Sequence, residues 1–158
     1  MQHLIPATVA FIQEAHAGQK YGNMPYFFHP VEVAEMAENL LVNGDFGHVH
    51  ANVRDVVLAA LLHDVIEDTE YTEADLRERF SPVVVDAVVL LTKDDNFDYR
   101  ANIQRIVDSG NYVAMVVKLA DNLVNNSGDK SAMAPARAAK LTERYTMSIG
   151  MLQQALNG

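Results

Sequence analysis

Four ionisable side chains gather at one end of a segment with a helical apolar pattern, at spacings that suit metal binding and acid–base chemistry. They are His63, Asp64, Glu67 and Asp68. At about 100° per residue, they fall within or beside the apolar arc of residues 53–60, and each of the first two has a carboxylate four residues later. A solvated, frayed helix end is the ordinary explanation. An unpaired buried carboxylate is costly, however, so the inward direction favours a charged or metal partner.

Two residues elsewhere in the chain extend this group. Asp121 interrupts an apolar stripe of a second predicted helix, where a buried Arg or a helix cap would be the simpler explanation. His29 precedes Pro30, which favours an extended conformation from which the imidazole reaches across the end of a helix bundle. Mixed nitrogen and oxygen ligands suit Mn²⁺, Fe²⁺, Zn²⁺ or Mg²⁺. The candidate ligands are His29, His63, Asp64 and Asp121.

Such a metal site would support hydrolysis of a phosphate ester. A bound divalent ion holds and acidifies a water and withdraws charge from a phosphoryl oxygen. Glu67, one turn after His63, is expected to orient that water or carry its proton, with Asp68 in support. The sequence leaves open which of the two carboxylates makes which transfer.

Proline and glycine placement predicts the helices that must position these groups. Four prolines open stretches rich in helix formers, where a missing N–H costs little: Pro6, Pro30, Pro82 and Pro135. Three glycines follow such stretches, where a left-handed residue often ends a helix: Gly18, Gly44 and Gly110. Helices are expected at residues 6–17, 30–43, 51–67, 73–80, 82–92, 98–109, 111–126 and 135–156. The fold class is therefore all-α, with about eight helices in a single domain over residues 1–158.

Two segments are also compatible with buried strands. Residues 82–91 and 112–117 are rich in β-branched side chains. Neither segment shows a sustained alternation of apolar and polar residues, and neither is flanked by hairpin turn signals. Helices are favoured for both.

The charge balance limits the class of partner. The chain has 12 Lys and Arg against 21 Asp and Glu, a net charge of −9, and no Cys. Without a basic run, it is a poor candidate for nucleic-acid binding, but a small anionic ligand remains compatible because a bound metal reverses the local field. The absence of Cys excludes disulfides and thiolate metal sites. No apolar run suits a membrane span and the N-terminus lacks the pattern of a signal peptide, so a cytoplasmic protein is expected.

Four words in the sequence carry a family resemblance. They are EAHAGQK at residues 14–20, PYFFHPVEVA at 25–34, AALLHDVIEDT at 59–69 and VKLADNL at 117–123. The spaced H…HD…D pattern of the four candidate ligands is similar to that of HD-domain metal-dependent phosphohydrolases. The surrounding words resemble the hydrolase domain of RelA/SpoT-type alarmone enzymes, from about residue 10 to residue 126. The chain looks like a stand-alone small alarmone hydrolase with an HD-domain helical bundle.

The resemblance implies a Mn²⁺-dependent hydrolase that removes the 3′-pyrophosphate of (p)ppGpp, the alarmone of the stringent response, to give GDP or GTP. It assigns metal binding to His29, His63, Asp64 and Asp121. It assigns catalysis to the Glu67-Asp68 pair. It places Asn125, Tyr145 and Lys20 in contact with the nucleotide.

The sequence departs from the family at two places, and these leave the substrate open. Lys20 is followed by Tyr21 where the family has a second basic residue, and residues 127–130 are less basic than the family's continuation. One alternative is an HD-type phosphatase acting on a nucleoside monophosphate or NADPH. Another is an inactive nucleotide-sensing module. The intact Glu67-Asp68 pair and the full set of candidate ligands favour an enzyme over a sensor.

Overall fold

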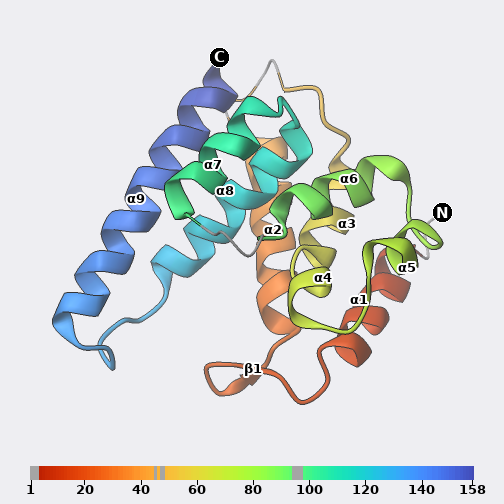
Figure 1. The fold of residues 1–158 in the computed structure, drawn as a ribbon, viewed down its shortest axis with the longest axis horizontal. Helices are drawn as coiled ribbons and strands as arrows, with labels where there is room; N and C mark the ends of the chain where they lie inside the picture. Colours follow the sequence, from red (N-terminus) through yellow and green to blue (C-terminus); the bar gives the residue numbers. More distant parts are fainter. Residues whose placement is uncertain (1–3, 45, 47–48, 94–97) are drawn as a thin grey trace.

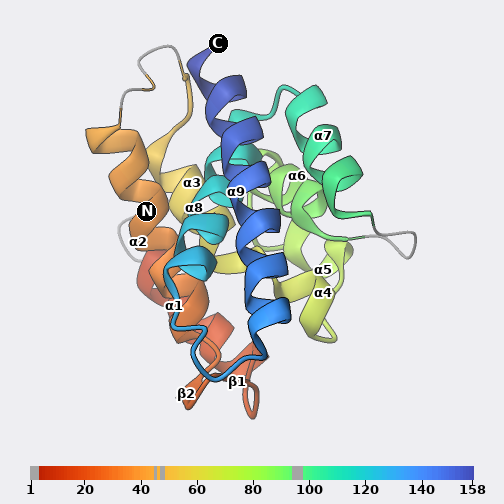
Figure 2. The ribbon, with the colours of Figure 1, turned by 90° about the vertical axis from the view of Figure 1, so that its left-hand side faces the viewer.

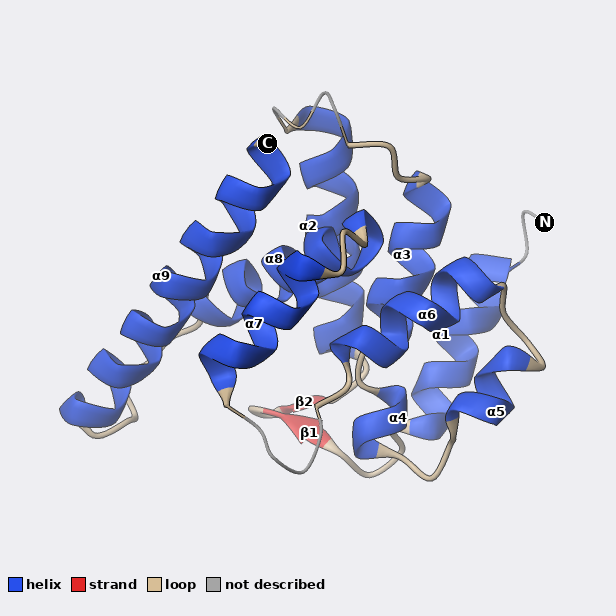
Figure 3. Cartoon of the chain, turned by 45° about the horizontal axis from the view of Figure 1, so that its top comes forward, coloured by secondary structure: helices blue, strands red, loops and turns tan. Residues whose placement is uncertain are grey.

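Helices make up most of the chain in the computed structural model, which describes residues 4–44, 46, 49–93 and 98–158 (Figure 1, Figure 3). The helices are α1 (Leu4–Ala15), α2 (Phe28–Asn43), α3 (Val53–Leu62), α4 (Val65–Asp68), α5 (Glu73–Arg77), α6 (Pro82–Leu91), α7 (Tyr99–Asp108), α8 (Tyr112–Ser127) and α9 (Pro135–Asn157). Two short strands, β1 (Lys20–Tyr21) and β2 (Met24–Pro25), form a hairpin between α1 and α2. The predicted all-α class is confirmed.

The helices α3 and α8 form the centre of the molecule. Every residue from Val56 to Leu62 is buried, and so is every residue from Val113 to Asn122. A helix that is apolar on all sides must be covered on all sides, and α2, α6 and α9 supply that cover. Figure 1 and Figure 2 show α9 running along α8 and α7 at one side of the bundle. The chemistry-bearing residues therefore sit on the innermost helices.

Both segments rich in β-branched residues are helical. Ser81 caps α6 by accepting a hydrogen bond from the Val84 amide, and Pro82 occupies the first helical position. Asn111 caps α8 by accepting from the Ala114 amide. The caps satisfy amides that a helix start leaves unpaired, and burial among neighbouring helices favours the β-branched side chains. The helix prediction is confirmed for both segments.

The prediction of one continuous helix over residues 51–67 is wrong. The helix α3 ends at Leu62, and Asp64, with φ −104° and ψ 0°, separates α3 from α4. The imidazole Nδ1 of His63 lies 2.6 Å from the carbonyl oxygen of Ala60, and the His63 amide also bonds to that oxygen. This tightens the last turn of α3, so the helix is interrupted at His63 and Asp64, two of the candidate ligands.

The hairpin was not expected from the sequence. Lys20 pairs with Pro25, and Tyr21 pairs with Met24. The connecting residue Gly22 has φ +62°, a conformation that favours glycine, and Gly-Asn is a two-residue turn signal. The sequence therefore contained the signal for this turn.

The three glycines expected to be left-handed behave differently from one another. Gly18 has φ +85° and Gly110 has φ +67°, as predicted. The prediction for Gly44 is wrong, because its backbone is extended, with φ −84° and ψ 166°. A Cβ on Gly44 would lie 2.1 Å from the carbonyl oxygen of Leu40, so glycine is needed there for a close approach.

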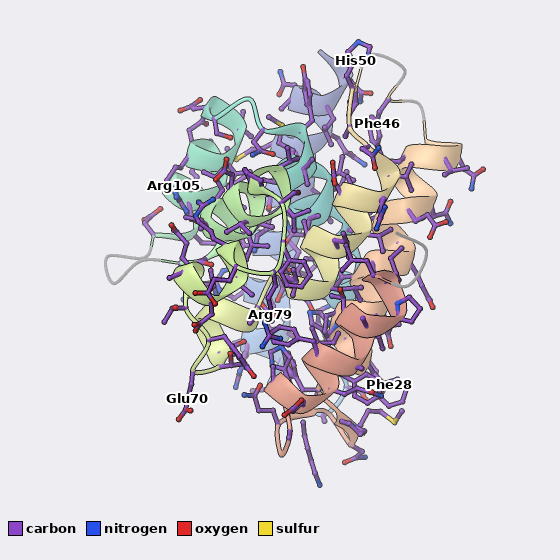
Figure 4. All side chains as sticks on the ribbon, turned by 90° about the vertical axis from the view of Figure 1, so that its right-hand side faces the viewer. Phe28, Phe46, His50, Glu70, Arg79 and Arg105 are labelled. Carbon is purple, nitrogen blue, oxygen red and sulfur yellow. The ribbon has the colours of Figure 1, made fainter. Side chains whose placement is uncertain are left out.

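Ring contacts hold the residues that flank the short helix α5 against α1. The guanidinium carbon of Arg79 lies 4.9 Å from the ring centroid of Phe11 and 5.9 Å from that of Tyr71. Arg79 is exposed, and Figure 4 shows that Glu70 projects from the edge of the molecule. None of the helices in the described part of the chain has the length and sustained apolar character that crossing a bilayer requires.

Candidate metal centre and active site

The four candidate ligands converge from three separate parts of the fold. His29 lies on α2, His63 and Asp64 lie at the junction of α3 and α4, and Asp121 lies on α8. His29 Nε2 is 3.1 Å from Asp121 Oδ1, and His63 Nε2 is 3.7 Å from the same oxygen. His63 Nε2 is also 3.1 Å from Asp64 Oδ2. One ligand atom from each of His29, His63 and Asp64 lies within 4.8 Å of the other two.

His29 reaches the cluster by a different route from the one expected. It lies in the first turn of α2, which begins at Phe28, and not in an extended segment before the helix. Pro30 is the third residue of the helix, where the missing amide hydrogen has no intrahelical partner to lose. The first turn can therefore start before the proline, and it directs a buried imidazole toward α8.

The orientation of His63 leaves one nitrogen available for a cation. A carbonyl oxygen only accepts, so the Nδ1 atom near Ala60 must carry the hydrogen. In the neutral ring, Nε2 then has a lone pair, and this buried atom makes no hydrogen bond within the described residues. It faces the carboxylates of Asp64 and Asp121. A lone pair among carboxylate oxygens is unfavourable unless a proton or a metal ion lies between them, so the donor set fits a divalent ion.

Neighbouring groups keep both candidate carboxylate ligands ionised. Burial opposes the charge on Asp121, but Lys118, whose Nζ is 3.5 Å from Oδ2, holds the pKa of that carboxyl well below its usual range. Burial likewise opposes the charge on Asp64, but His63 lowers the pKa of Asp64 to about 2. The hydroxyl of Tyr26 adds to this effect by donating a hydrogen bond to Asp64 Oδ2.

The two predicted catalytic carboxylates lie beside the cluster. Ligand oxygens of Asp64, Glu67 and Asp68 lie within 4.8 Å of one another. Glu67 Oε1 accepts a 2.9 Å hydrogen bond from the Lys93 amide, and the Glu67 side chain is 25% exposed. Burial, followed by the charges of Asp64 and Glu67, raises the pKa of Asp68. Gln19 holds this turn by donating a 2.7 Å hydrogen bond to the Asp68 carbonyl.

A small polar cavity of about 40 Å³ opens between the cluster and Glu67. Lys93 and the buried Lys118 also line it. A buried water needs about 10–15 Å³ of cavity volume, so this cavity has room for a few waters but not for a nucleotide. It is a suitable place for the water that a hydrolase requires.

A larger cavity of about 500 Å³ lies on another side of the cluster. Asn125 connects the two, because it donates to Asp121 Oδ1 at 3.1 Å and accepts from the Tyr21 hydroxyl at 2.9 Å. The Tyr21 ring stacks on His29 with centroids 4.4 Å apart. Tyr145 lines this cavity, whereas Lys20 is exposed on β1 and does not line either cavity. Asn125 and Tyr145 thus share a cavity and Lys20 does not.

Sequence reasoning missed Tyr26, Tyr21 and Lys118. Lys118 carried a signal, since a lysine in an apolar stripe three residues before an aspartate needs a buried partner. Tyr26 and Tyr21 carried none, because their hydroxyl partners lie 38 and 104 residues away in sequence. Only the fold brings those pairs together.

Comparison with protein families gives a match to the family described as HD domain, over residues 8–149. A guanosine-3′,5′-bis(diphosphate) 3′-pyrophosphohydrolase of Haemophilus influenzae is 34% identical over 112 residues, which cover 70% of this chain and 15% of the relative. The MESH1 enzyme of Danio rerio, named as a hydrolase of the same type, is 32% identical over 124 residues, which cover 75% of this chain and 64% of the relative. The chain thus spans only part of the length of these relatives.

A solved structure has the same fold. It is reported under the words "A metazoan ortholog of SpoT hydrolyzes ppGpp and plays a role in starvation responses", with a TM-score of 0.71 and 24% identity. The match covers 98% of this chain and 85% of the other. The family match extends over most of the sequence and includes His29, the His63-Asp64 pair and Asp121. The chain therefore belongs to the HD domain family.

Proposed function

We propose that this chain is a divalent-metal-dependent phosphohydrolase that removes the 3′-pyrophosphate of (p)ppGpp, yielding GDP or GTP and pyrophosphate. The observation that carries the proposal is the convergence of His29, His63, Asp64 and Asp121. At its centre, the Nε2 atom of His63 has no hydrogen-bond partner within the described residues. The names of the Haemophilus influenzae and Danio rerio relatives support the choice of substrate.

We assign metal binding to those four side chains and propose Mn²⁺ as the native ion. Two imidazole nitrogens and two carboxylates suit an ion of intermediate hardness, and four protein ligands leave positions of a six-coordinate ion for water and substrate. When bound, the ion would acidify a water and draw charge from a phosphoryl oxygen.

We assign the proton transfers to Glu67, with Asp68 in support. Glu67 lines the small cavity, and its hydrogen bond from the Lys93 amide fixes it at the edge of the water site. In the reaction, the water oxygen bonds to the phosphorus attached to O3′, the phosphorus–O3′ bond breaks, and the departing O3′ takes a proton. The raised pKa of Asp68 suits a group that shares the proton released by the water.

The nucleoside would occupy the larger cavity. Its volume of about 500 Å³ is in the range of small-molecule sites, and it adjoins the cluster through Asn125 and Tyr21. Tyr145 offers an aromatic wall on the opposite helix. We propose residues 1–158 as one catalytic domain, acting in the cytoplasm on a small nucleotide and not on a nucleic acid.

Product analysis tests the function. The purified chain is incubated with Mn²⁺ and ppGpp, and pyrophosphate is measured by chromatography, with nucleoside monophosphates and NADPH tested in parallel. Release of pyrophosphate from ppGpp is expected. Orthophosphate released from the monophosphates or from NADPH, without pyrophosphate from ppGpp, would contradict the proposal in favour of a general phosphatase. Binding of ppGpp without any product would favour a sensor.

One substitution ties the activity to the cluster. Asp121→Ala removes a carboxylate that lies next to both imidazoles and is expected to abolish both Mn²⁺ binding and turnover. Full turnover by this variant would refute the assigned site, whatever substrate the wild-type chain hydrolyses.

A further inference from the structure

The larger cavity lacks the cations that the family resemblance places on its hairpin. Tyr21 stands where the family has a second basic residue. Its hydroxyl donates a hydrogen bond to Asn125, and its ring stacks on His29. Lys20 is exposed and does not line the cavity. A chain with a net charge of −9 repels a polyphosphate unless a local cation offsets that field. A cation from another element is therefore needed.

The segment that connects α8 to α9 and the start of α9 supply two cations to this cavity, Lys130 and Arg137. Figure 2 shows this segment descending to the hairpin. Lys130 is already engaged, because its Nζ donates a 2.9 Å hydrogen bond to the Asn126 carbonyl and lies 3.5 Å from the Asn126 side-chain oxygen. That contact satisfies the carboxyl-terminal end of α8.

Arg137 differs from Lys130 because it has no such partner. No hydrogen bond, ion pair or ring contact joins it to any residue in the described part of the chain. It lies in the first turn of α9, which has no acidic residue to balance it. A cation in the first turn of a helix is unfavourable for the helix dipole, and it adds to the positive potential that the unpaired amides create there. The position therefore favours an anion from outside the chain.

Guanidinium matches phosphate in shape as well as in charge. Its planar donors form paired hydrogen bonds with phosphate oxygens. A nucleotide whose 3′-diphosphate lies at the metal cluster has its ribose and 5′-phosphates left to place in the adjoining cavity. Asp129 also lines this cavity and would repel phosphate, so the phosphates belong on the α9 side.

We propose that Arg137 binds the 5′-phosphates of the nucleotide, so that α9 supplies the phosphate recognition that the hairpin lacks. This inference rests on the proposed function. It makes Arg137 a specificity-determining residue for substrates that carry a 3′-diphosphate and 5′-phosphates together.

The test compares Arg137→Ala with the wild-type chain on substrates that differ only at the 5′ position. These are ppGpp, its analogue with one 5′-phosphate, and guanosine 3′-diphosphate with none. Loss of a charged hydrogen-bond pair should raise KM for ppGpp by about 10- to 100-fold, without a matching fall in kcat. The increase should shrink with one 5′-phosphate and vanish with none. Arg137→Lys should restore part of the affinity.

Lys140→Ala is the matched control, since it removes the same charge from the same helix at a position outside this cavity. An equal rise in KM in both variants, or a rise in Arg137→Ala that does not depend on the 5′-phosphates, would overturn the inference. If the wild-type chain released no pyrophosphate from any of the three substrates, the proposed function would fail and the inference with it. Circular dichroism melting of both variants checks that they fold.

Discussion

Tyr26 holds one of the candidate metal ligands in place through a single hydroxyl group. That hydroxyl donates to Asp64 Oδ2, while the ring packs against His16 with centroids 4.8 Å apart. The two roles are separable, because a phenylalanine keeps the ring and removes the donor. Hydrogen-bond partners of metal ligands fix the orientation of the ligand, and their loss weakens metal binding.

Tyr26→Phe is therefore expected to weaken Mn²⁺ binding by about 10- to 100-fold. Calorimetric titration of the metal-free protein measures the change. Tyr71→Phe is a suitable control, because the Tyr71 ring packs on Phe11 at 4.8 Å, away from the candidate ligands. Unchanged affinity in Tyr26→Phe would show that Asp64 is held by other contacts.

Glu67→Gln separates metal binding from catalysis. The change keeps the shape and the acceptor for the Lys93 amide but removes the proton acceptor. Turnover should fall by about 10²- to 10⁴-fold while Mn²⁺ binding stays close to that of the wild-type chain. Glu70→Gln, at an exposed position that Figure 4 shows at the edge of the molecule, should leave both unchanged. Normal turnover in Glu67→Gln would move the proton transfer to another group.

The arrangement of helices shows which local rules hold and which fail. The starts of α6 and α8 follow from caps and a proline that are visible in the sequence. The candidate ligands can also be predicted from the sequence, since a charged residue inside an apolar pattern needs a partner. The break after Leu62 cannot, because it arises when the imidazole of His63 takes the carbonyl of Ala60. The pattern of a continuous helix therefore cannot be extended beyond Leu62, although the residues that follow still converge on the cluster.

Asn122 joins three helices beside the candidate metal centre. This fully buried side chain on α8 donates to Ser148 Oγ on α9 and accepts a 2.8 Å hydrogen bond from the Tyr99 hydroxyl on α7. Truncation removes both of these hydrogen bonds and leaves a cavity at a fully buried position of α8. Each lost hydrogen bond costs about 0.5–1.5 kcal/mol, and the cavity adds to that cost.

Asn122→Ala should accordingly lower the free energy of unfolding by about 2–4 kcal/mol. Urea unfolding monitored by circular dichroism measures it. Asn39→Ala is the comparison, since Asn39 is exposed on α2 and its side chain accepts a hydrogen bond from the Asn43 side chain. Equal losses in the two variants would mean that the interior contacts of Asn122 contribute nothing beyond an ordinary surface bond.

For the whole molecule, the candidate metal centre links folding to pH. In the metal-free chain, burial opposes the charge on His63, but the carboxylate of Asp64 and then Asp121 raise its pKa well above 6.5. The folded state therefore holds this proton more tightly than the unfolded state. That stabilisation is complete below the unfolded pKa, about 6.5, and is lost as pH rises through the higher folded value. Asp64 acts in the opposite sense, because its stabilisation is lost as pH falls toward its folded pKa of about 2.

A divalent ion held by the candidate ligands would replace the proton on His63, so metal should stabilise the chain more as pH rises. At about 100 times Kd, the ion adds about 2.7 kcal/mol to the free energy of unfolding. Urea unfolding with and without Mn²⁺ at about pH 6 and about pH 8 should give a larger metal effect at the higher value. Asp121→Ala should show none. A metal effect that is equal at both values would argue against proton displacement at this site.

The metal cluster and the larger cavity are built from largely separate parts of the chain. The candidate ligands lie on α2, the α3–α4 junction and α8, whereas most of the cavity wall beyond Asn125 comes from the hairpin, the α8–α9 connection and α9. On the proposed function, the residues that would cleave the bond and those that would select the nucleotide are therefore largely separate. A library of variants restricted to residues 128–141 should therefore alter substrate preference while leaving the candidate metal site unchanged. This separation makes the scaffold a practical starting point for engineering.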